Sequence, residues 1–229
     1  MSLLVEQVVT DAAMKFGDPV YQRIDQSDWL RHYNTATRDI ASHWDVLEHR
    51  VFFTLEAGND AYGYPADMVR LSEIAVSTEL VGDPGLQAVD EDAFDDLGEL
   101  FRDEFRASTR RRYPTGTPKR YYARQNWFHL IPKPDVQVVR GGRIHYFGLP
   151  DQLFTLSGAL YQLPEFTQDA AIERMVIAAL EQDERLTEAT QKYQKWLAEG
   201  PFIEDRMQDR SKDRRENLRP PDDPYRGMA

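Results

Sequence analysis

The chain of 229 residues contains no cysteine. It therefore cannot form disulfides, use a thiolate as a nucleophile or bind zinc through sulfur. The absence favours a reducing compartment. A chain of this length buries roughly 70% of the surface that it exposes when unfolded, so its core needs neither disulfides nor a metal.

Long apolar runs are also missing. No 18 consecutive residues are apolar, so the sequence predicts no transmembrane helix and no membrane partner. The first residues, MSLLVEQVVTDAAMKF, lack the basic start and the apolar run of a secretory signal. We therefore expect the protein to be cytosolic when it is made.

Sequence motifs for catalysis are absent too. The five histidines form no metal-type pair on a helix face, and there is no nucleophile elbow, phosphate-binding glycine loop or dinucleotide fingerprint. The acidic run over 90–96 fails the calcium-loop template because Phe94 occupies a ligand position. We interpret its carboxylates as the first turn of a helix, where the helix dipole stabilises them. The sequence thus predicts no catalytic residue, no cofactor and no metal site.

One enzymatic alternative stays open, because two carboxylates brought together by the fold could act as a glycosidase pair. The protein would then be an enzyme that acts on the cell wall or on nucleic acid.

The net charge of −11 is unevenly distributed. Residues 1–107 carry 8 basic and 22 acidic side chains, whereas residues 108–146 carry 9 basic and 1 acidic. The acidic remainder argues against binding duplex DNA over a broad surface, since it repels phosphates. The basic middle segment is the exception.

The hydrophobic pattern predicts an α+β fold, with an antiparallel bundle of about four helices and a middle region rich in β-hairpins. Ser27 is the expected N-cap of the second helix. The expected helices span 3–15, 28–45, 90–106, 167–184 and 186–199, and the β-rich segments span 50–80 and 117–147. Gly141-Gly142 is expected to form a turn between two short strands. Together these elements form one domain over 1–200.

The segment GTPKRYYARQNWFHLIPKP (116–134) is predicted to form two strands, 119–124 and 127–131, around a turn at Gln125-Asn126. We expect Tyr122, Trp127 and Leu130 to anchor this region to the helices. A basic patch accompanies it, formed by Arg110, Arg111, Arg112, Lys119, Arg120 and Arg124.

This patch has three interpretations. It could pair with acidic faces of neighbouring subunits or partners. It could bind single-stranded nucleic acid, with Tyr113, Tyr121 and Tyr122 as stacking platforms. It could also be a solvated flank of the hairpin.

The last segment, 201–229, loses helical periodicity and mixes charges with prolines. It is either a floppy tail or an arm that orders on a partner. As an arm it would use sparse anchors, namely Phe202, Ile203, Met207, Leu218 and Tyr225.

Four blocks in order resemble the head-to-tail adaptor, or connector, proteins of tailed bacteriophages. The helix DWLRHYNTATRDIASHWDVLE (28–48) is followed by FFTLEAGNDAYGYPADMVRLSEI (52–74), which contains the pattern P-A-D-x-x-R-L. The G-T-P and P-x-P ends of 116–134 come next, and a helical pair over 171–199 closes the series.

The resemblance implies a structural virion protein without catalysis. Such proteins form a ring, typically of twelve copies, that docks beneath the portal protein and carries the tail or the next connector protein. Double-stranded DNA passes through the channel during genome ejection without specific binding. The resemblance also implies that the arm over 201–229 docks to the portal, and that the protein lies at the head–tail interface of the virion after assembly in the host cytoplasm.

Overall fold

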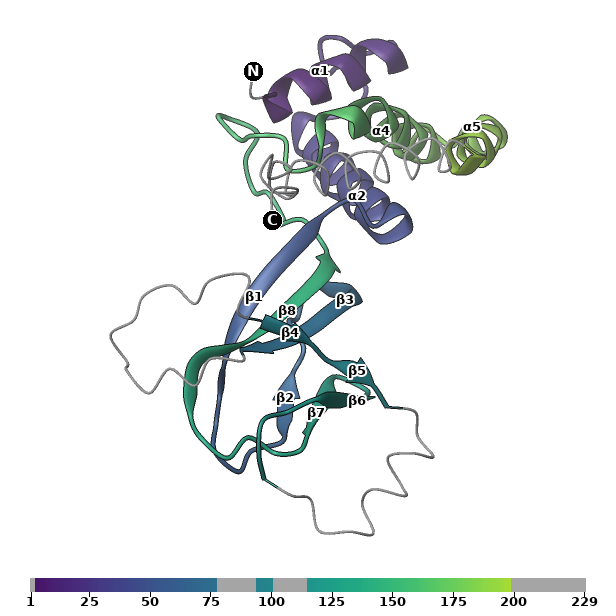
Figure 1. Cartoon of the computed structure of the whole chain (residues 1–229). Coiled ribbons are helices and arrows are strands. Elements are labelled where there is room, and N and C mark those ends of the chain that lie inside the picture. Colours follow the sequence, from purple (N-terminus) through teal and green to yellow (C-terminus); the bar gives the residue numbers. More distant parts are fainter. Residues whose placement is uncertain (1–2, 78–93, 101–114, 199–229) are drawn as a thin grey trace, which may run out of the picture. The chain divides into compact units, whose positions relative to one another are not determined.

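The computed structural model describes residues 3–77, 94–100 and 115–198. The chain divides into two compact units. A helical unit combines the two ends of the chain, Met1–Leu47 and Pro150–Ala229, and a β unit comprises Glu48–Leu149. In Figure 1 the helical unit therefore contains both the purple and the green-to-yellow helices. The α+β class predicted from the sequence is confirmed.

Four α-helices form the described part of the helical unit: α1 (Val5–Phe16), α2 (Gln26–Trp44), α4 (Gln168–Gln182) and α5 (Leu186–Ala198). A short 3-10 helix, η2 (Glu165–Thr167), precedes α4. The helices predicted over 3–15, 28–45, 167–184 and 186–199 lie within two residues of these bounds.

The predicted N-cap of α2 is wrong. The cap is Asp25, and Ser27 lies inside the first turn. The buried carboxylate of Asp18 accepts hydrogen bonds from the backbone N–H groups of Gln22, Arg23 and Ile24, and so fixes the chain just before the helix.

Helix α4 is the centre of the helical unit, because it packs against α1, α2 and α5. Its buried side chains occur on all sides of the helix, as expected for a helix surrounded by others. They are Ala170, Ala171, Ile172, Met175, Val176, Ile177, Ala178, Ala179 and Leu180.

Trp196 joins α5 to two other helices. It is 1% exposed, and its indole N–H donates a hydrogen bond to the carbonyl of Ala170 at 2.9 Å. Its ring lies 4.4 Å from that of Trp44, at the end of α2, and stacks on that of Tyr193. Nearby, Arg174 donates to the carboxylate of Asp39 at 2.6 Å, which links α4 to α2. Aromatic burial and paired polar groups thus hold three helices together.

The β unit contains two four-stranded sheets (Figure 1). The first has the order β1-β8-β3-β4, formed by β1 (Glu48–Leu55), β8 (Val138–Gly148), β3 (Met68–Ser77) and β4 (Phe94–Asp96). The second has the order β2-β7-β6-β5, formed by β2 (Ala61–Gly63), β7 (Trp127–Ile131), β6 (Arg120–Arg124) and β5 (Gly98–Glu99).

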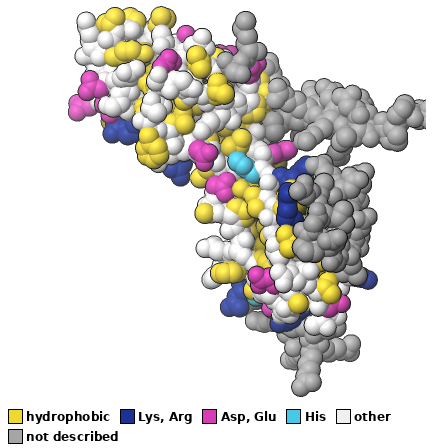
Figure 2. All heavy atoms as spheres, turned by 90° about the vertical axis from the view of Figure 1, so that its left-hand side faces the viewer, with side chains coloured by type: hydrophobic (Ala, Val, Ile, Leu, Met, Phe, Trp, Pro, Cys, Tyr) yellow, Lys and Arg dark blue, Asp and Glu magenta, His cyan; other side chains and the backbone are white. Residues whose placement is uncertain are grey.

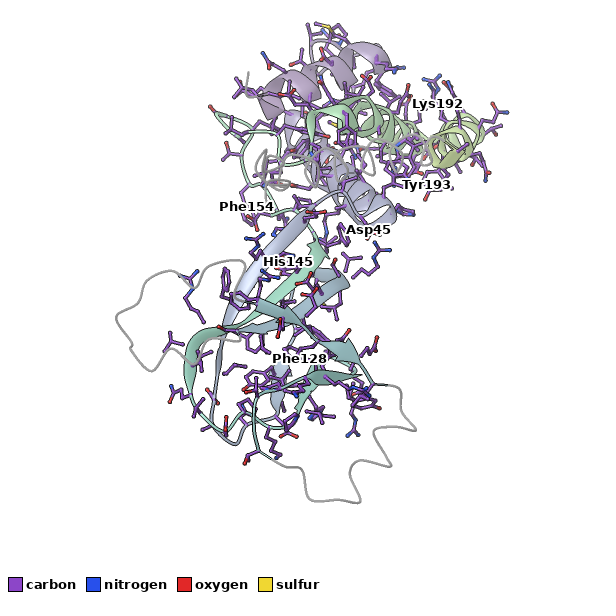
Figure 3. All side chains as sticks on the ribbon, viewed as in Figure 1. Asp45, Phe128, His145, Phe154, Lys192 and Tyr193 are labelled. Atoms are coloured by element: carbon purple, nitrogen blue, oxygen red, sulfur yellow. The ribbon has the colours of Figure 1, made fainter. Side chains whose placement is uncertain are left out.

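Both sheets contribute to one core. Phe128 and Leu130 of β7 are fully buried, and they belong to the same cluster as Ile74 of β3 and Ile144 of β8. Phe128, labelled in Figure 3, contacts the rings of Phe53, Tyr62 and Tyr64.

The helix predicted over 90–106 is wrong within the described residues, because 94–100 contains two strands. Phe94, Leu97 and Leu100 have helical spacing, but the backbone pairs with both sheets. The backbone N–H of Leu97 donates to the carbonyl of Ile74, and the backbone N–H of Leu100 donates to the carbonyl of Tyr121. Gly98 between them weakens any helix. Asp95 and Asp96 therefore lie on a strand and not in the first turn of a helix.

The turn predicted at Gly141-Gly142 is also wrong, because β8 runs unbroken through both residues. The two glycines allow neighbouring side chains to lie directly against the backbone of β8. A Cβ at Gly142 would lie 2.2 Å from the ring of Phe53, and one at Gly141 would lie 2.6 Å from Val138. Glycine inside a strand often marks such an approach.

Substitution Gly142→Ala should destabilise the β unit by about 1–3 kcal/mol, the usual cost of overpacking, because Phe53 is held by Tyr62 and Phe128. Urea unfolding measures the change. Gly98→Ala is the matched control, since a Cβ there meets nothing within 4 Å. Equal effects of the two substitutions would contradict this packing role.

Candidate interaction surface

The outer side of the β2-β7-β6-β5 sheet carries basic and aromatic side chains. Side chains alternate along a strand, and Tyr62, Tyr121, Phe128 and Leu130 point into the core. The cross-strand pairs Arg124–Trp127, Tyr122–His129 and Arg120–Ile131 therefore share the opposite side, together with Ala61 and Gly63 of β2. We call this set of residues the basic-aromatic face.

An open hollow of about 380 Å³ lies on this face. Ala61, Arg124, Gln125, Trp127 and His129 line it. Trp127 is 53% exposed, which is unusual for so large an apolar side chain. Its neighbour across the strand pair, Gly63, has no side chain to cover it. The small residues of β2 thus leave the indole ring accessible.

The face is positively charged. Arg120 and Arg124 are exposed, and neither pairs with a carboxylate in the described residues. His129 and Lys133 differ, because the carboxylate of Asp60 lies 3.6 Å from His129 and 3.2 Å from Lys133. Exposed guanidinium groups beside an accessible indole suit a partner that offers carboxylates and aromatic or apolar side chains.

The structure brings together part of the predicted patch. Arg120 and Arg124 lie on the face, and Lys119 precedes it directly, with its N–H donating to Ile131. Trp127, expected to anchor the hairpin to the helices, is 53% exposed, and Leu130 is buried in a core cluster formed by residues of the β unit alone. Tyr121 is 8% exposed and belongs to the core, so it cannot be a stacking platform.

The other predicted partner-binding residues lie outside the described residues. They are Arg110, Arg111, Arg112, Phe202, Ile203, Met207, Leu218 and Tyr225, and Tyr113 also lies there. Sequence reasoning missed Trp127 and His129 as surface residues. The signal was present as the alternation of WFHLI, but both sets of alternate positions in it contain apolar residues.

A carboxylate pair does form, on the other sheet. Glu73 and Asp96 share a hydrogen bond, and Arg143 contacts Glu73 at 2.7 Å and Asp96 at 3.9 Å. Partial burial raises the pKa of Asp96 to about 6, and the hydrogen bond with Glu73 and the charge of Glu73 act in the same direction. Burial alone would also raise the pKa of Glu73, but hydrogen bonds from Asp96 and Arg143 lower it.

This pair is not arranged as a glycosidase site. The two carboxyl groups of a retaining glycosidase are about 5 Å apart and leave room for the sugar. Glu73 and Asp96 instead form a hydrogen bond with each other, and the guanidinium of Arg143 lies over the ring of Phe94 beside them. The pair fastens β4 to the sheet.

The pair makes stability depend on pH. The pKa of Asp96 is higher in the folded state than its ordinary value of 3.8, so its contribution is complete below that value and is lost as pH rises through about 6. The contribution of Glu73, whose pKa is lowered, has the opposite sign and is lost at acid pH.

We expect Asp96→Asn, which stays neutral, to gain stability relative to the wild type between about pH 5 and about pH 7.5. The gain should stay below about 1 kcal/mol, because the Asp96 side chain is 67% exposed and solvent screens it. Thermal unfolding at both pH values measures it, with Asp95→Asn as control. A gain that shrinks with rising pH would contradict the assignment.

Two further observations concern the described residues alone. Within them, no three His, Asp or Glu side chains gather in a way that could bind a metal ion. No described helix is both long and apolar enough to span a bilayer. On the face drawn in Figure 2, acidic and basic side chains are interspersed over both units.

The fold and the basic-aromatic face describe an α+β protein whose accessible site is suited to contacts with other macromolecules. The SU10 adaptor protein family matches residues 4–223, and the chain belongs to this family of phage adaptor proteins. The comparison with curated proteins gives no match. The family supports a structural role at the junction of head and tail.

Proposed function

We propose that the protein forms a ring, of about twelve copies as is typical of the resembling connectors, under the portal protein of the phage head. The ring extends the DNA channel and provides the attachment site for the tail or the next connector. The family match over residues 4–223 carries this proposal, since it spans both units and most of the C-terminal segment.

The charge distribution supports such a ring. A heterologous contact joins two different surfaces of the same chain and closes into a ring if its rotation allows. The acidic first part of the sequence and its basic middle segment offer complementary surfaces for contacts of this kind. DNA would pass acidic channel walls without specific binding, because its phosphates find few counter-charges there.

Electron microscopy of the purified protein mixed with its portal tests the proposal. We expect a ring of density on the outer end of the portal. A failure of the two proteins to associate, with no ring at any concentration, would contradict the proposed function. The alternative of a cell-wall or nucleic-acid enzyme predicts activity in a peptidoglycan zymogram or a nuclease assay.

The basic-aromatic face should contribute to assembly through its charges. The double substitution Arg120→Gln and Arg124→Gln should slow association several-fold and flatten its salt dependence, because exposed charges act mainly on association rate. Light scattering at two salt concentrations measures both. Arg38→Gln with Lys195→Gln, which removes two exposed charges from the helical unit, is the control.

If both double variants behave alike, the effect comes from net charge and not from this face. Binding of single-stranded nucleic acid, lost in the first variant alone, would favour the alternative interpretation of the basic patch.

A further inference from the structure

Phe154 is the most exposed large hydrophobic side chain in the described residues, at 85%. It lies on the segment between β8 and η2 (Figure 3). Single exposed apolar residues are common on protein surfaces. Phe154 differs from them because the backbone beside it is held firmly.

The side chain of Asn34, on α2, holds this backbone in place through two hydrogen bonds. The side-chain amide N–H of Asn34 donates to the carbonyl of Leu153 at 2.9 Å, and its amide oxygen accepts from the N–H of Leu153 at 2.9 Å. C-terminal to Phe154, Leu156 is buried, and the backbone N–H of Tyr161 donates to the carbonyl of Leu3. An anchor on a fixed backbone loses little conformational freedom when it binds.

The hollow on the basic-aromatic face can accept a phenyl ring. The hollow is open to solvent and measures about 380 Å³, which leaves room for a ring to lie against its lining. Trp127 offers an aromatic neighbour, and Arg124 offers a guanidinium for a cation–π contact. A phenyl ring held there would cover the exposed indole.

The two segments also have opposite charges. Residues 149–164, the segment that carries Phe154, contain no Lys or Arg and one acidic residue, Asp151, whereas residues 115–134 contain four Lys or Arg and no acidic residue. Asp151 lies three positions before Phe154. Attraction between the segments would guide the contact and fix its orientation.

We propose that Phe154 of one copy inserts into the hollow beside Trp127 of a second copy. This inference rests on the proposed ring, and it names one contact between neighbouring subunits. The contact joins different surfaces of the chain, and is therefore of the heterologous kind from which rings are built.

The absence of cysteine makes the contact directly testable. One tagged chain carries Phe154→Cys, a second with a different tag carries Ala61→Cys, and the two are mixed with portal and treated with a short bifunctional thiol reagent. We expect a cross-linked product that carries both tags. Leu186→Cys replaces Phe154→Cys in the control, because Leu186 is 62% exposed on α5 and should give no product.

Substitutions give a second measure. Phe154→Ser removes the anchor, and Ala61→Ile fills the hollow with a residue suited to a strand. Each should weaken ring assembly about tenfold or more, as expected for the loss of a central anchor. Leu160→Ser, on the same segment and 55% exposed, is the control. Phe154→Ser should leave the melting temperature unchanged.

The possible outcomes are distinct. Absence of rings from the wild-type chain contradicts the proposed function. Rings that form equally well from Phe154→Ser, or that yield no cross-link between the two tags, contradict only the Phe154 contact. A product linking Phe154→Cys to the portal, or a link within a single chain carrying both cysteines, would also overturn it by identifying another occupant of the hollow.

Discussion

A chain that ends after Gly200 should fold normally and fail to attach to the portal. Helix α5 ends at Ala198, so the truncation keeps every helix and strand that the structure describes. The removed segment contains the five predicted anchors, which lie among charged residues, namely Phe202, Ile203, Met207, Leu218 and Tyr225. Segments of this composition bind by ordering along a partner surface.

The expected loss is large, because each buried aromatic or aliphatic anchor contributes about 1–2 kcal/mol or more to an interface. Loss of two anchors alone would weaken binding about a hundredfold. Co-sedimentation of portal and adaptor measures attachment, and circular dichroism checks that the truncated chain is folded. The control replaces the charged residues of the segment with serine and keeps its five anchors.

Normal attachment of the truncated chain would show that the arm is dispensable. If the control variant fails as completely as the truncation, the charges and not the apolar anchors carry the contact.

Trp196→Ala should destabilise the helical unit by about 3–5 kcal/mol, the usual cost of removing a buried tryptophan. Its ring is 1% exposed and contacts Trp44, and its N–H donates to the carbonyl of Ala170. The substitution therefore opens a cavity between three helices and removes a buried hydrogen bond. This is a large share of the stability of an ordinary domain.

Urea unfolding followed by circular dichroism at a helix-sensitive wavelength measures the effect. The chain divides into two compact units, so the signal of the helices has to be followed on its own. Leu197→Ala is the control, because Leu197 is the next residue of α5 but is 37% exposed. A cost below about 1 kcal/mol would contradict the joining role of Trp196.

The sequence predicts the helices of the helical unit well for a physical reason. Their apolar residues recur with the period of a helix, and this pattern survives whatever the helices pack against. The segment 94–100 has the same spacing, yet it forms strands, because two sheets offer it backbone partners that no local pattern reveals. The turn predicted at Gly142 is wrong for a similar reason. The glycine is needed because the ring of Phe53, which is distant in the sequence, lies against it.

The candidate site was predictable in part. Strands β6 and β7 follow from alternation, and the basic residues Arg120 and Arg124 follow from charge. Which side of β7 faces the core does not follow, because Trp127 and Ile131 are as apolar as Phe128 and Leu130. Only the position of the other sheet decides that Phe128 is buried and Trp127 is accessible.

The discontinuous helical unit has a consequence for how the family can vary. The chain leaves this unit after Leu47 and returns at Pro150, and Glu48 and Phe147 are paired neighbours on β1 and β8. Paired residues of antiparallel strands lie about 5 Å apart, so the β unit begins and ends at nearly one point. A unit inserted in this way can be exchanged without changing the path of the chain in the helical unit. Residues 48–149 could thus be exchanged as a block while the four described helices stay the same.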